Sequence, residues 1–297
     1  MTDSDKELLL SSDNPLTHPD QDELDYSPFA QIMAKSIVNM SPSDGFVMSL
    51  NGPWGSGKST VLNFVVHYLN QYDSELRPIV VQFNPWWFSD REDLIRLLIG
   101  QLRTTLGKKD FAELRKKLAT FSELVSNIPS LPGRDFGRMA AKLLDKQPEI
   151  ISLKKSIGKL LLDSNKKILV IIDDIDRLPP DEIRELFRMI KATANFPNTI
   201  YLLAFDNQVV TDALERGFVS SGKDYLEKIV QVPFVLPNPE KFSLRRLLFK
   251  KLDSILADTP TELFDKSYWT NTFFEGIDHY IFTPRVTCPR SLYHLHS

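Results

Sequence analysis

The sequence predicts an α/β fold of three layers, in which helices cover both faces of a parallel β-sheet. Five apolar stretches have the length and composition of buried strands, and helical patterns separate them along the chain. This alternation is typical of strand–helix–strand units, which build parallel sheets. Polar or glycine-rich residues follow several of the strands, at the sheet edge where α/β proteins bind ligands. The predicted strands are 46–50, 78–83, 168–172, 199–206 and 228–237.

The first predicted strand runs into a loop with the pattern Gly-x-x-x-x-Gly-Lys-Ser at residues 52–59, and a helical pattern follows at 60–66. The glycines permit backbone angles that let successive N–H groups turn inward around an anion. Lys58 supplies a positive charge for the β- and γ-phosphates, and the Ser59 hydroxyl suits Mg²⁺. Because the helix begins at the phosphates, its dipole also favours negative charge there. The predicted nucleotide-binding residues of this loop are Gly52, Pro53, Trp54, Gly55, Ser56, Gly57, Lys58, Ser59 and Thr60.

Composition limits the class of protein. The 297 residues are 42% hydrophobic and 25% charged, which is ordinary for a globular protein with one large core. The net charge of -3 argues against bulk electrostatic binding of nucleic acid. The lone Cys288 excludes an internal disulfide framework and suits a reducing compartment. Because the N-terminus is polar and no apolar run approaches about 18 residues, we expect a cytoplasmic protein without a membrane span.

Two stretches flank the first strand–helix unit. Residues 1–26 are rich in Asp, Glu and Ser, which predicts an extended acidic lead. After this lead, apolar residues recur at three- and four-residue spacing between 29 and 40, which predicts a helix. Strand 78–83 is followed by a loop that contains Trp86 and Trp87. The two tryptophans form either an aromatic plug beneath the sheet or a surface for a partner or for the nucleotide.

Residues 107–167 interrupt the alternation and predict a helical insertion between the second and third strands. Two helical patterns, at 111–125 and 151–161, flank a bend marked by Pro and Gly at 129–133. The insertion holds about twice as many Lys and Arg as Asp and Glu. A solvated helix surface is the usual explanation for such a bias, and a patch for nucleic acid or anionic lipid is the alternative.

The third predicted strand is a continuous aliphatic run that ends in Asp173-Asp174-Ile175-Asp176-Arg177. This pattern places carboxylates at the carboxyl edge of a parallel sheet. Downstream of a phosphate-binding loop, we expect Asp173 to hold Mg²⁺, directly or through water, and Asp174 to orient an attacking water. Arg177 either reaches the phosphate of a neighbouring subunit or pairs with an acid.

Asp206 is the first polar residue after the apolar part of the fourth strand. It either senses the γ-phosphate through water or caps the helix predicted at 207–214. Residues 238–297 predict a helical extension, which begins with an amphipathic helix at 242–256.

Several of these stretches together resemble the KAP family of P-loop NTPases, a branch of the additional-strand ATPases related to AAA and STAND proteins. The Gly-Pro-Trp-Gly form of the phosphate loop and the Asn-Pro-Trp form after the second strand are specific to this family, whereas a bare phosphate loop is not. The resemblance covers roughly residues 14–285. The stretches that carry it are 52–59, 83–87, 173–177, 205–206 and 225–231.

The resemblance implies a sheet in the order 5-1-4-3-2, with the strand that ends at Asp206 between the phosphate-loop strand and the strand that ends at Asp173. It also implies one nucleotide-binding domain over 27–237. Many family members carry membrane helices where this chain has its insertion, 107–167, which is too polar to span a bilayer. Family members usually continue after a Thr-Pro-Arg element with a helix rich in Arg and Asn. This chain departs from that pattern after Arg285, so we expect the extension 238–297 to be shortened or altered at its end and do not assign Arg285 a phosphate-sensing role.

We therefore expect a Mg²⁺-dependent ATPase, with ATP favoured over GTP, that acts as a conformational switch or an assembly ATPase. Lys58 and the loop amides stabilise the phosphates, Ser59 and Asp173 hold the metal, and Asp174 positions the water. The resemblance to soluble bacterial members implies a role in antiphage defence. It also implies protein partners from the same operon, or self-association.

Three alternatives stay open. One is a nucleotide-binding scaffold that barely turns over, because Asp174 is shorter than the Glu common in fast relatives. Another is a phosphotransferase that acts on nucleic acid or a metabolite held by the basic insertion. The third is an adaptor that uses the loop of Trp86 and Trp87 as its binding patch.

Overall fold

The computed structural model describes ten stretches of the chain, which form two compact units. The sheet unit comprises residues 33–53 and 68–235, and the terminal unit comprises 1–32, 54–67 and 236–297. The first half of the predicted acidic lead, the bend at 129–133 and Cys288 lie outside the described residues. The described residues are 14–40, 44–88, 94–107, 111–126, 148–193, 195–216, 221–257, 259–260, 262 and 264–287.

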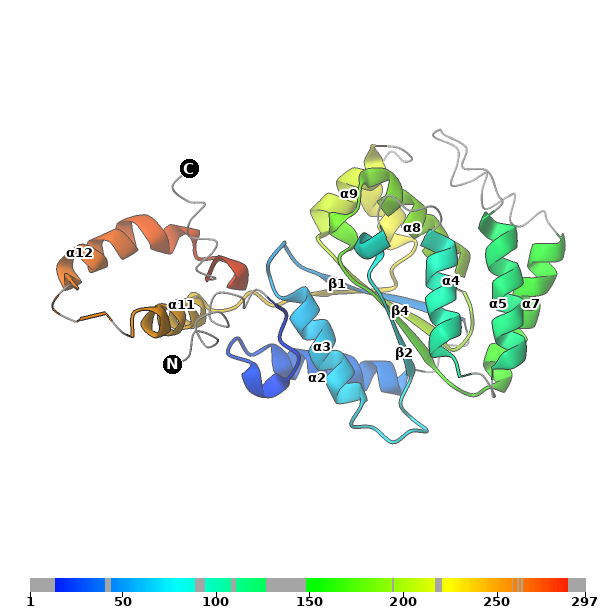
Figure 1. Cartoon of the computed structure of the whole chain (residues 1–297). Helices are drawn as coiled ribbons and strands as arrows, with labels where there is room; N and C mark the ends of the chain where they lie inside the picture. The colour runs from blue at the N-terminus through cyan, green and yellow to red at the C-terminus, as the bar shows by residue number, and fades with distance from the viewer. Residues whose placement is uncertain are drawn as a thin grey trace. The chain divides into compact units, whose positions relative to one another are not determined.

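The sheet unit is built on five parallel strands (Figure 1). Their order, β2-β3-β4-β1-β5, is the predicted order read from the other edge. As predicted, β4 lies between β1 and β3, and all five strands end on the same edge of the sheet. The strands are β1 Phe46–Asn51, β2 Ile79–Phe83, β3 Ile168–Ile172, β4 Thr199–Phe205 and β5 Val232–Val235.

The inner strands β3 and β4 are buried along their whole length. Both consist almost entirely of aliphatic and aromatic residues, which is typical of a strand covered on both faces. Alternate residues point to opposite faces, so Val170, Ile172 and Leu203 join one core with Val47 of β1 and Phe83 of β2. The apolar strands therefore hold the polar residues that follow them at a fixed edge.

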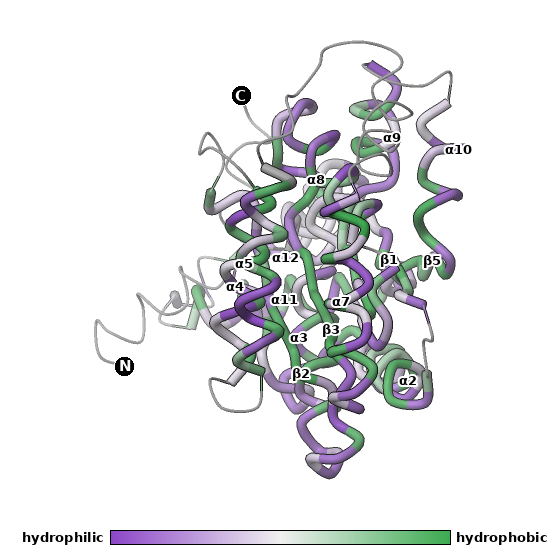
Figure 2. Tube along the Cα trace, turned by 90° about the vertical axis from the view of Figure 1, so that its right-hand side faces the viewer, coloured by the Kyte–Doolittle hydropathy of each residue, from purple (hydrophilic) through white to green (hydrophobic). Residues whose placement is uncertain are grey.

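Helices follow the strands in the predicted alternation. In the insertion, α5 packs between α4 and α7, so the predicted helical insertion between β2 and β3 is confirmed (Figure 1). Green and purple segments alternate along these helices in Figure 2, as expected for helices with one apolar side. The helices of the sheet unit are α4 Leu94–Thr105, α5 Ala112–Ser126, α7 Pro148–Asp163, α8 Pro180–Thr193, α9 Asn207–Glu215 and α10 Gly222–Glu227. No helix of the described stretches combines the length and apolarity needed to cross a bilayer.

The fifth strand is shorter than predicted, because it begins at Val232 and not at residue 228 and ends at Val235 and not at residue 237. The N–H groups of Ile229 and Val230 both donate to the carbonyl of Leu226, at 2.9 and 2.8 Å, and so extend the last turn of α10. Gln231 then exchanges bonds with the β1 backbone. Its N–H donates to Val47 O at 2.9 Å, and its side-chain Oε1 accepts from Val47 N at 2.7 Å. The prediction missed that the helix end captures these donors before the strand begins.

The terminal unit contains α11 Lys241–Ile255, close to the predicted helix, and α12 Lys266–Asn271. Short turns follow at Thr272–Ile277, Asp278–Tyr280 and Pro284–Thr287. A small core forms around Leu244, Leu248, Phe273 and Ile281. Two longer helices, α2 Tyr26–Asn39 and α3 Lys58–Leu69, begin in the terminal unit and end in the sheet unit.

Asp278 joins α11 to the turns that follow α12. It accepts from Nε of Arg245 at 2.6 Å, from Nη2 of Arg245 at 2.7 Å and from Nζ of Lys241 at 2.7 Å. The hydrogen bonds from Arg245, aided by those from Lys241, hold the pKa of the Asp278 carboxyl well below its usual value. This ion-pair group connects the turn Asp278–Tyr280 to α11.

Candidate functional site

The phosphate loop leaves β1 at Gly52, whose N–H donates to Phe205 O at 3.3 Å and so extends the pairing of β1 with β4 by one bond. The loop then adopts left-handed backbone conformations at Gly55 and Gly57, with φ of +79° and +95°. Residues with a Cβ rarely adopt such angles, so both positions require glycine. Helix α3 begins at Lys58, which is buried. The predicted strand–loop–helix unit is therefore present.

Tyr26 braces this loop from the start of α2. Its hydroxyl donates to the Ser56 carbonyl at 2.7 Å, and the side chain is buried. A Cβ built on Gly57 would lie 2.8 Å from Cε2 of Tyr26, so the ring occupies the space that the glycine leaves. Burial, aided by the charge of Asp22, raises the pKa of Tyr26 well above its usual value and keeps the phenol a donor.

The segment before α2 also ties onto α3. The Leu16 N–H donates to Oγ1 of Thr60 at 3.2 Å, and the Leu16 carbonyl accepts from Nδ2 of Asn63 at 2.9 Å. Thr60, predicted to bind nucleotide, thus supports the first turn of α3 through a side-chain bond to a segment 44 residues earlier.

Arg285 contacts the loop from the other end of the chain. Its guanidinium carbon lies 3.7 Å from the ring centroid of Trp54, and its backbone N–H donates to Gly55 O at 3.3 Å. A Cβ on Gly55 would lie 2.7 Å from Cβ of Arg285. The cation stacks on the exposed tryptophan and leaves little room for any residue but glycine.

Two buried polar atoms near the start of the loop have no hydrogen-bond partner among the described residues. They are Oδ1 of Asn51, the last residue of β1, and Oγ of Ser56. Buried polar atoms in native proteins are normally paired, so each is suited to bond a ligand or a water. The Ser56 hydroxyl belongs to the predicted nucleotide-binding set.

The carboxylates lie at the end of β3, as predicted. The Asp173 N–H donates to Phe83 O at 3.2 Å, and one Asp173 carboxylate oxygen accepts from the Asp174 N–H at 2.8 Å. Asp174 itself has φ of +58°, a conformation that is uncommon outside glycine but tolerated by Asp. The chain turns sharply here into the 3₁₀ helix Ile175–Arg177.

Asn84 and Arg177 fix the Asp174 carboxylate from opposite oxygens. Nδ2 of Asn84 donates to one oxygen at 2.7 Å, and Nε of Arg177 donates to the other at 2.8 Å. An ionised carboxylate can accept about four hydrogen bonds, so acceptor capacity remains for a water. Of the two predicted roles for Arg177, pairing with an acid is the one seen within this chain.

The Trp86 and Trp87 side chains are exposed by 45% and 71%, so the aromatic plug predicted there is wrong. The ring that packs against the core is Phe88, which stacks on Phe83 with centroids 6.0 Å apart. The Trp86 ring instead stacks on the Arg177 guanidinium, whose central carbon lies 5.2 Å from the ring centroid of Trp86. Both tryptophans therefore lie at the surface, and their use by a partner or by the nucleotide stays a prediction.

Asp206 caps α9, because its carboxylate accepts from the Gln208 N–H at 3.0 Å. Of the two roles predicted for Asp206, helix capping is the one that the structure shows. A contact with the γ-phosphate stays a prediction. Sequence reasoning gave no role to Tyr26, Asn84 or Leu16. Asn84 belongs to the Asn-Pro-Trp motif and follows a strand, which was a usable signal, whereas nothing local marks the other two.

In the described part of the chain, no cluster of three or more His, Cys, Asp and Glu side chains is arranged to hold a metal ion. Mg²⁺ bound together with a nucleotide needs fewer protein ligands, because phosphate oxygens and waters complete its octahedral shell. Ser59 and Asp173 are half-buried and supply the hydroxyl and carboxylate oxygens that Mg²⁺ prefers. Their chemistry therefore fits the ion.

Comparison with known proteins gives one family and several distant likenesses. The model of the KAP family P-loop domain matches residues 26–296. The phage T7 exclusion protein of Escherichia coli strain K12 is 25% identical over 266 aligned residues, which cover 79% of this chain and 36% of that protein. The chain thus spans about a third of the length of this curated relative.

Two solved structures are similar at low identity. The Walker-type ATPase of Pyrococcus abyssi aligns with a TM-score of 0.48 and 15% identity, over 97% of this chain and 72% of that one. Cdc6p of Pyrobaculum aerophilum aligns with a TM-score of 0.43 and 15% identity, over 86% of this chain and 54% of that one.

Proposed function

The chain belongs to the KAP family of P-loop domains, and from this premise we propose that it binds ATP with Mg²⁺ and hydrolyses the β–γ bond. One observation supports the proposal above the others. A loop with left-handed Gly55 and Gly57 runs directly into α3, and the strand before it ends on the same sheet edge as the strand that carries Asp173 and Asp174. Backbone N–H groups at such a helix start favour a bound phosphate.

Each residue of the loop has a defined task in this proposal. The loop amides and the Lys58 ammonium bind the β- and γ-phosphates, and the buried Ser56 hydroxyl gains a partner in the ligand. Ser59 and Asp173 hold Mg²⁺, which neutralises phosphate charge when it is bound. The protein supplies position and electrostatics, since phosphoryl transfer needs little covalent help.

Asp174 orients the attacking water. Asn84 and Arg177 each bond one of its oxygens and fix its direction, while the remaining lone pairs accept from the water. Because Arg177 also neutralises the carboxylate, the same contacts favour a second candidate, a nucleotide-bound scaffold that turns over slowly.

A measurement of ATP hydrolysis tests the proposal. The assay uses the chain in molar excess over labelled ATP, with Mg²⁺ present, so that each ATP is hydrolysed at most once. The wild type is expected to release phosphate under these conditions, and Lys58→Ala is expected to lose ATP binding or turnover. Lys35→Ala removes an exposed lysine of α2 and is the matched control. Hydrolysis by Lys58→Ala at the wild-type rate would overturn the mechanism. Tight ATP binding without phosphate release in the wild type would favour the scaffold.

We further propose that ATP changes the state of assembly. Arg285 couples the loop to the turn that follows α11 and α12, so a ligand in the loop has a direct route to that part of the terminal unit. Light scattering after size exclusion, with and without a non-hydrolysable ATP analogue, measures the effect. An increase in mass supports an assembly ATPase, and an unchanged mass at saturation counts against it.

The relative named for phage exclusion suggests a defence role, and we propose the same for this chain. Bacteria that express the wild-type chain are expected to give fewer plaques than those that express Lys58→Ala. Equal plaque counts would show that the activity that depends on Lys58 is not needed for defence.

A further inference from the structure

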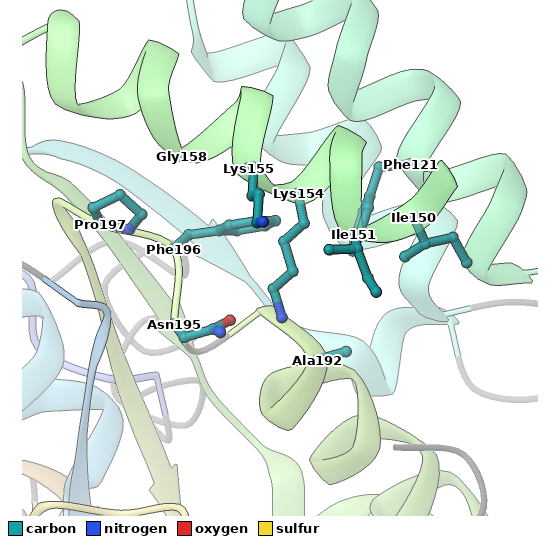
Figure 3. A pocket seen from close by; sticks show the side chains of 10 residues that line it. All are labelled: Phe121, Ile150, Ile151, Lys154, Lys155, Gly158, Ala192, Asn195, Phe196 and Pro197. Carbon is teal, nitrogen blue, oxygen red and sulfur yellow. The ribbon is translucent and has the colours of Figure 1, made fainter. Parts of the chain in front are cut away.

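A cavity of about 320 Å³ opens on the sheet unit (Figure 3). It lies between α7, α5 and the segment that joins α8 to β4. Because α8 ends at Thr193 and β4 begins at Thr199, this is the amino edge of the sheet. Asp173 and Asp174 follow β3 on the opposite edge. The cavity is therefore a site distinct from the candidate nucleotide site.

Its deep wall is apolar. Phe121 and Phe196 meet edge to face, with centroids 5.6 Å apart and planes at 64°. Ile150 of α7 is also buried at the cavity. Gly158 also lines the cavity, opposite Pro197, and a Cβ there would lie at an ordinary van der Waals distance of 3.4 Å from the Pro197 ring. These surfaces suit a large apolar group.

The mouth is basic. Lys154 extends from α7 toward Ala192 and Asn195 (Figure 3), and its ammonium lies 6.0 Å from the centroid of the Phe196 ring. Lys155 also lines the cavity and is exposed. Along α7 the middle turns carry only positive charge, because its two acids stand near its ends, at 149 and 163. An anionic partner is therefore favoured over a cationic one.

We propose that this cavity docks an acidic peptide segment of a partner protein, with one large apolar side chain in the cavity and carboxylates against Lys154 and Lys155. The volume stands at the low end of the roughly 300–1,000 Å³ of small-molecule sites, and the cavity is open to solvent. A protruding side chain fits such an opening, with Asn195 at the rim to bond the peptide backbone. α8 and β4 run from this site to the residues around Asp174 and Asp206.

Fluorescence polarisation with a defined probe tests the proposal on the full chain. The probe is a labelled octapeptide with Leu-Phe at its centre and Asp and Glu on both sides. Lys155→Glu reverses a charge at the mouth, and Lys159→Glu makes the same change on an exposed residue of α7 outside the cavity. Ala192→Phe fills the cavity from the last turn of α8. Thermal melts check that each variant is folded.

The probe is expected to bind the wild type, and Lys155→Glu and Ala192→Phe are expected to weaken binding about tenfold or more, with less than about a twofold effect of Lys159→Glu. If Lys155→Glu and Lys159→Glu weakened peptide binding equally, the binding would reflect non-specific attraction to the positive charge of α7, and the proposal would be wrong. Equal binding of a peptide with Ala-Ala at its centre would exclude use of the cavity. Absence of binding, or stronger competition by a single-stranded oligonucleotide than by unlabelled peptide, would also overturn the proposal.

Discussion

The phosphate loop and the carboxylate edge of the sheet are held in shape by different kinds of neighbour. At the carboxylate edge, Asp173 continues the pairing of β3 with β2, and Asp174 is fixed by Asn84 from the end of that adjacent strand. The loop instead takes its support from Tyr26 and Arg285, which belong to neither β1 nor α3. A sheet supplies its own register, whereas a loop of glycines has none and depends on contacts from elsewhere.

The largest effect is expected at the carboxylate edge. Asp174→Asn keeps the size of the side chain but removes the negative charge. That charge orients the attacking water by accepting its hydrogen bond. Turnover is expected to fall about 100-fold or more, while the dissociation constant for ATP changes little. Single-turnover rates and equilibrium binding measure the two separately. Asp176→Asn changes a carboxylate on the same turn, and an equal loss there would remove the special role of Asp174.

In the loop, Gly57→Ala is expected to weaken ATP binding about 10- to 100-fold. The new methyl group meets the Tyr26 ring at 2.8 Å, and φ of +95° disfavours any Cβ. Gly100→Ala is the matched control, because Gly100 lies inside α4 with open space around it. That change should leave ATP binding intact and stabilise the helix by roughly 0.5–1 kcal/mol. Wild-type affinity in Gly57→Ala would show that the loop does not need its left-handed turn.

The same contrast explains how much the sequence could predict. The insertion and the carboxylates followed from apolar runs and from motifs, because strand burial and strand ends are local properties. The order of the strands is not local, and it was implied only by the resemblance to the KAP family. The side chain of Asn84 lay within a quoted motif, yet its bond to Asp174 became evident only from the pairing of β2 with β3. The start of β5 was missed because a helix end competed for the same N–H groups.

Contacts between residues far apart in the sequence could not be predicted from the sequence pattern. Tyr26 stands 30 residues before its acceptor, Ser56, and is the last residue of the lead 1–26, which was predicted to be extended. The tryptophans 86 and 87 misled for a related reason. Their size favours burial, but Phe88 already fills the place beside Phe83, and the Arg177 side chain offers Trp86 a partner at the surface.

Acid is expected to affect the stability of the two units differently. Asp278 has a lowered pKa, so its contribution to stability is complete at neutral pH and is lost as the pH falls below about 4, toward the depressed value. β3 and β4 contain no carboxylate, so lowering the pH titrates no side chain within these strands. Hydrogen exchange along α11 is expected to accelerate at lower pH before that of β3.

Asp278→Asn should reproduce this effect at neutral pH. Loss of the charged bonds to Arg245 and Lys241 is expected to lower the stability of the terminal unit and to speed hydrogen exchange along α11. Asp253→Asn, which changes an exposed carboxylate of α11 itself, is the control. Similar exchange rates along α11 in both variants would show that this ion-pair group does not fix the turns onto the helix.

The smallest expected effect isolates the brace on the loop. Tyr26→Phe keeps the ring against Gly57 but removes the donor to the Ser56 carbonyl, a bond worth about 0.5–1.5 kcal/mol. If that bond sets the loop for phosphate, ATP affinity should fall about 3- to 10-fold, with a similar fall for ADP and an unchanged single-turnover rate at saturation. Tyr280→Phe alters a half-exposed tyrosine of the same unit and should change neither. A purely structural role would lower the melting temperature of Tyr26→Phe and leave the dissociation constant at its wild-type value, so the affinity decides whether the brace shapes the site or merely stabilises the fold around it.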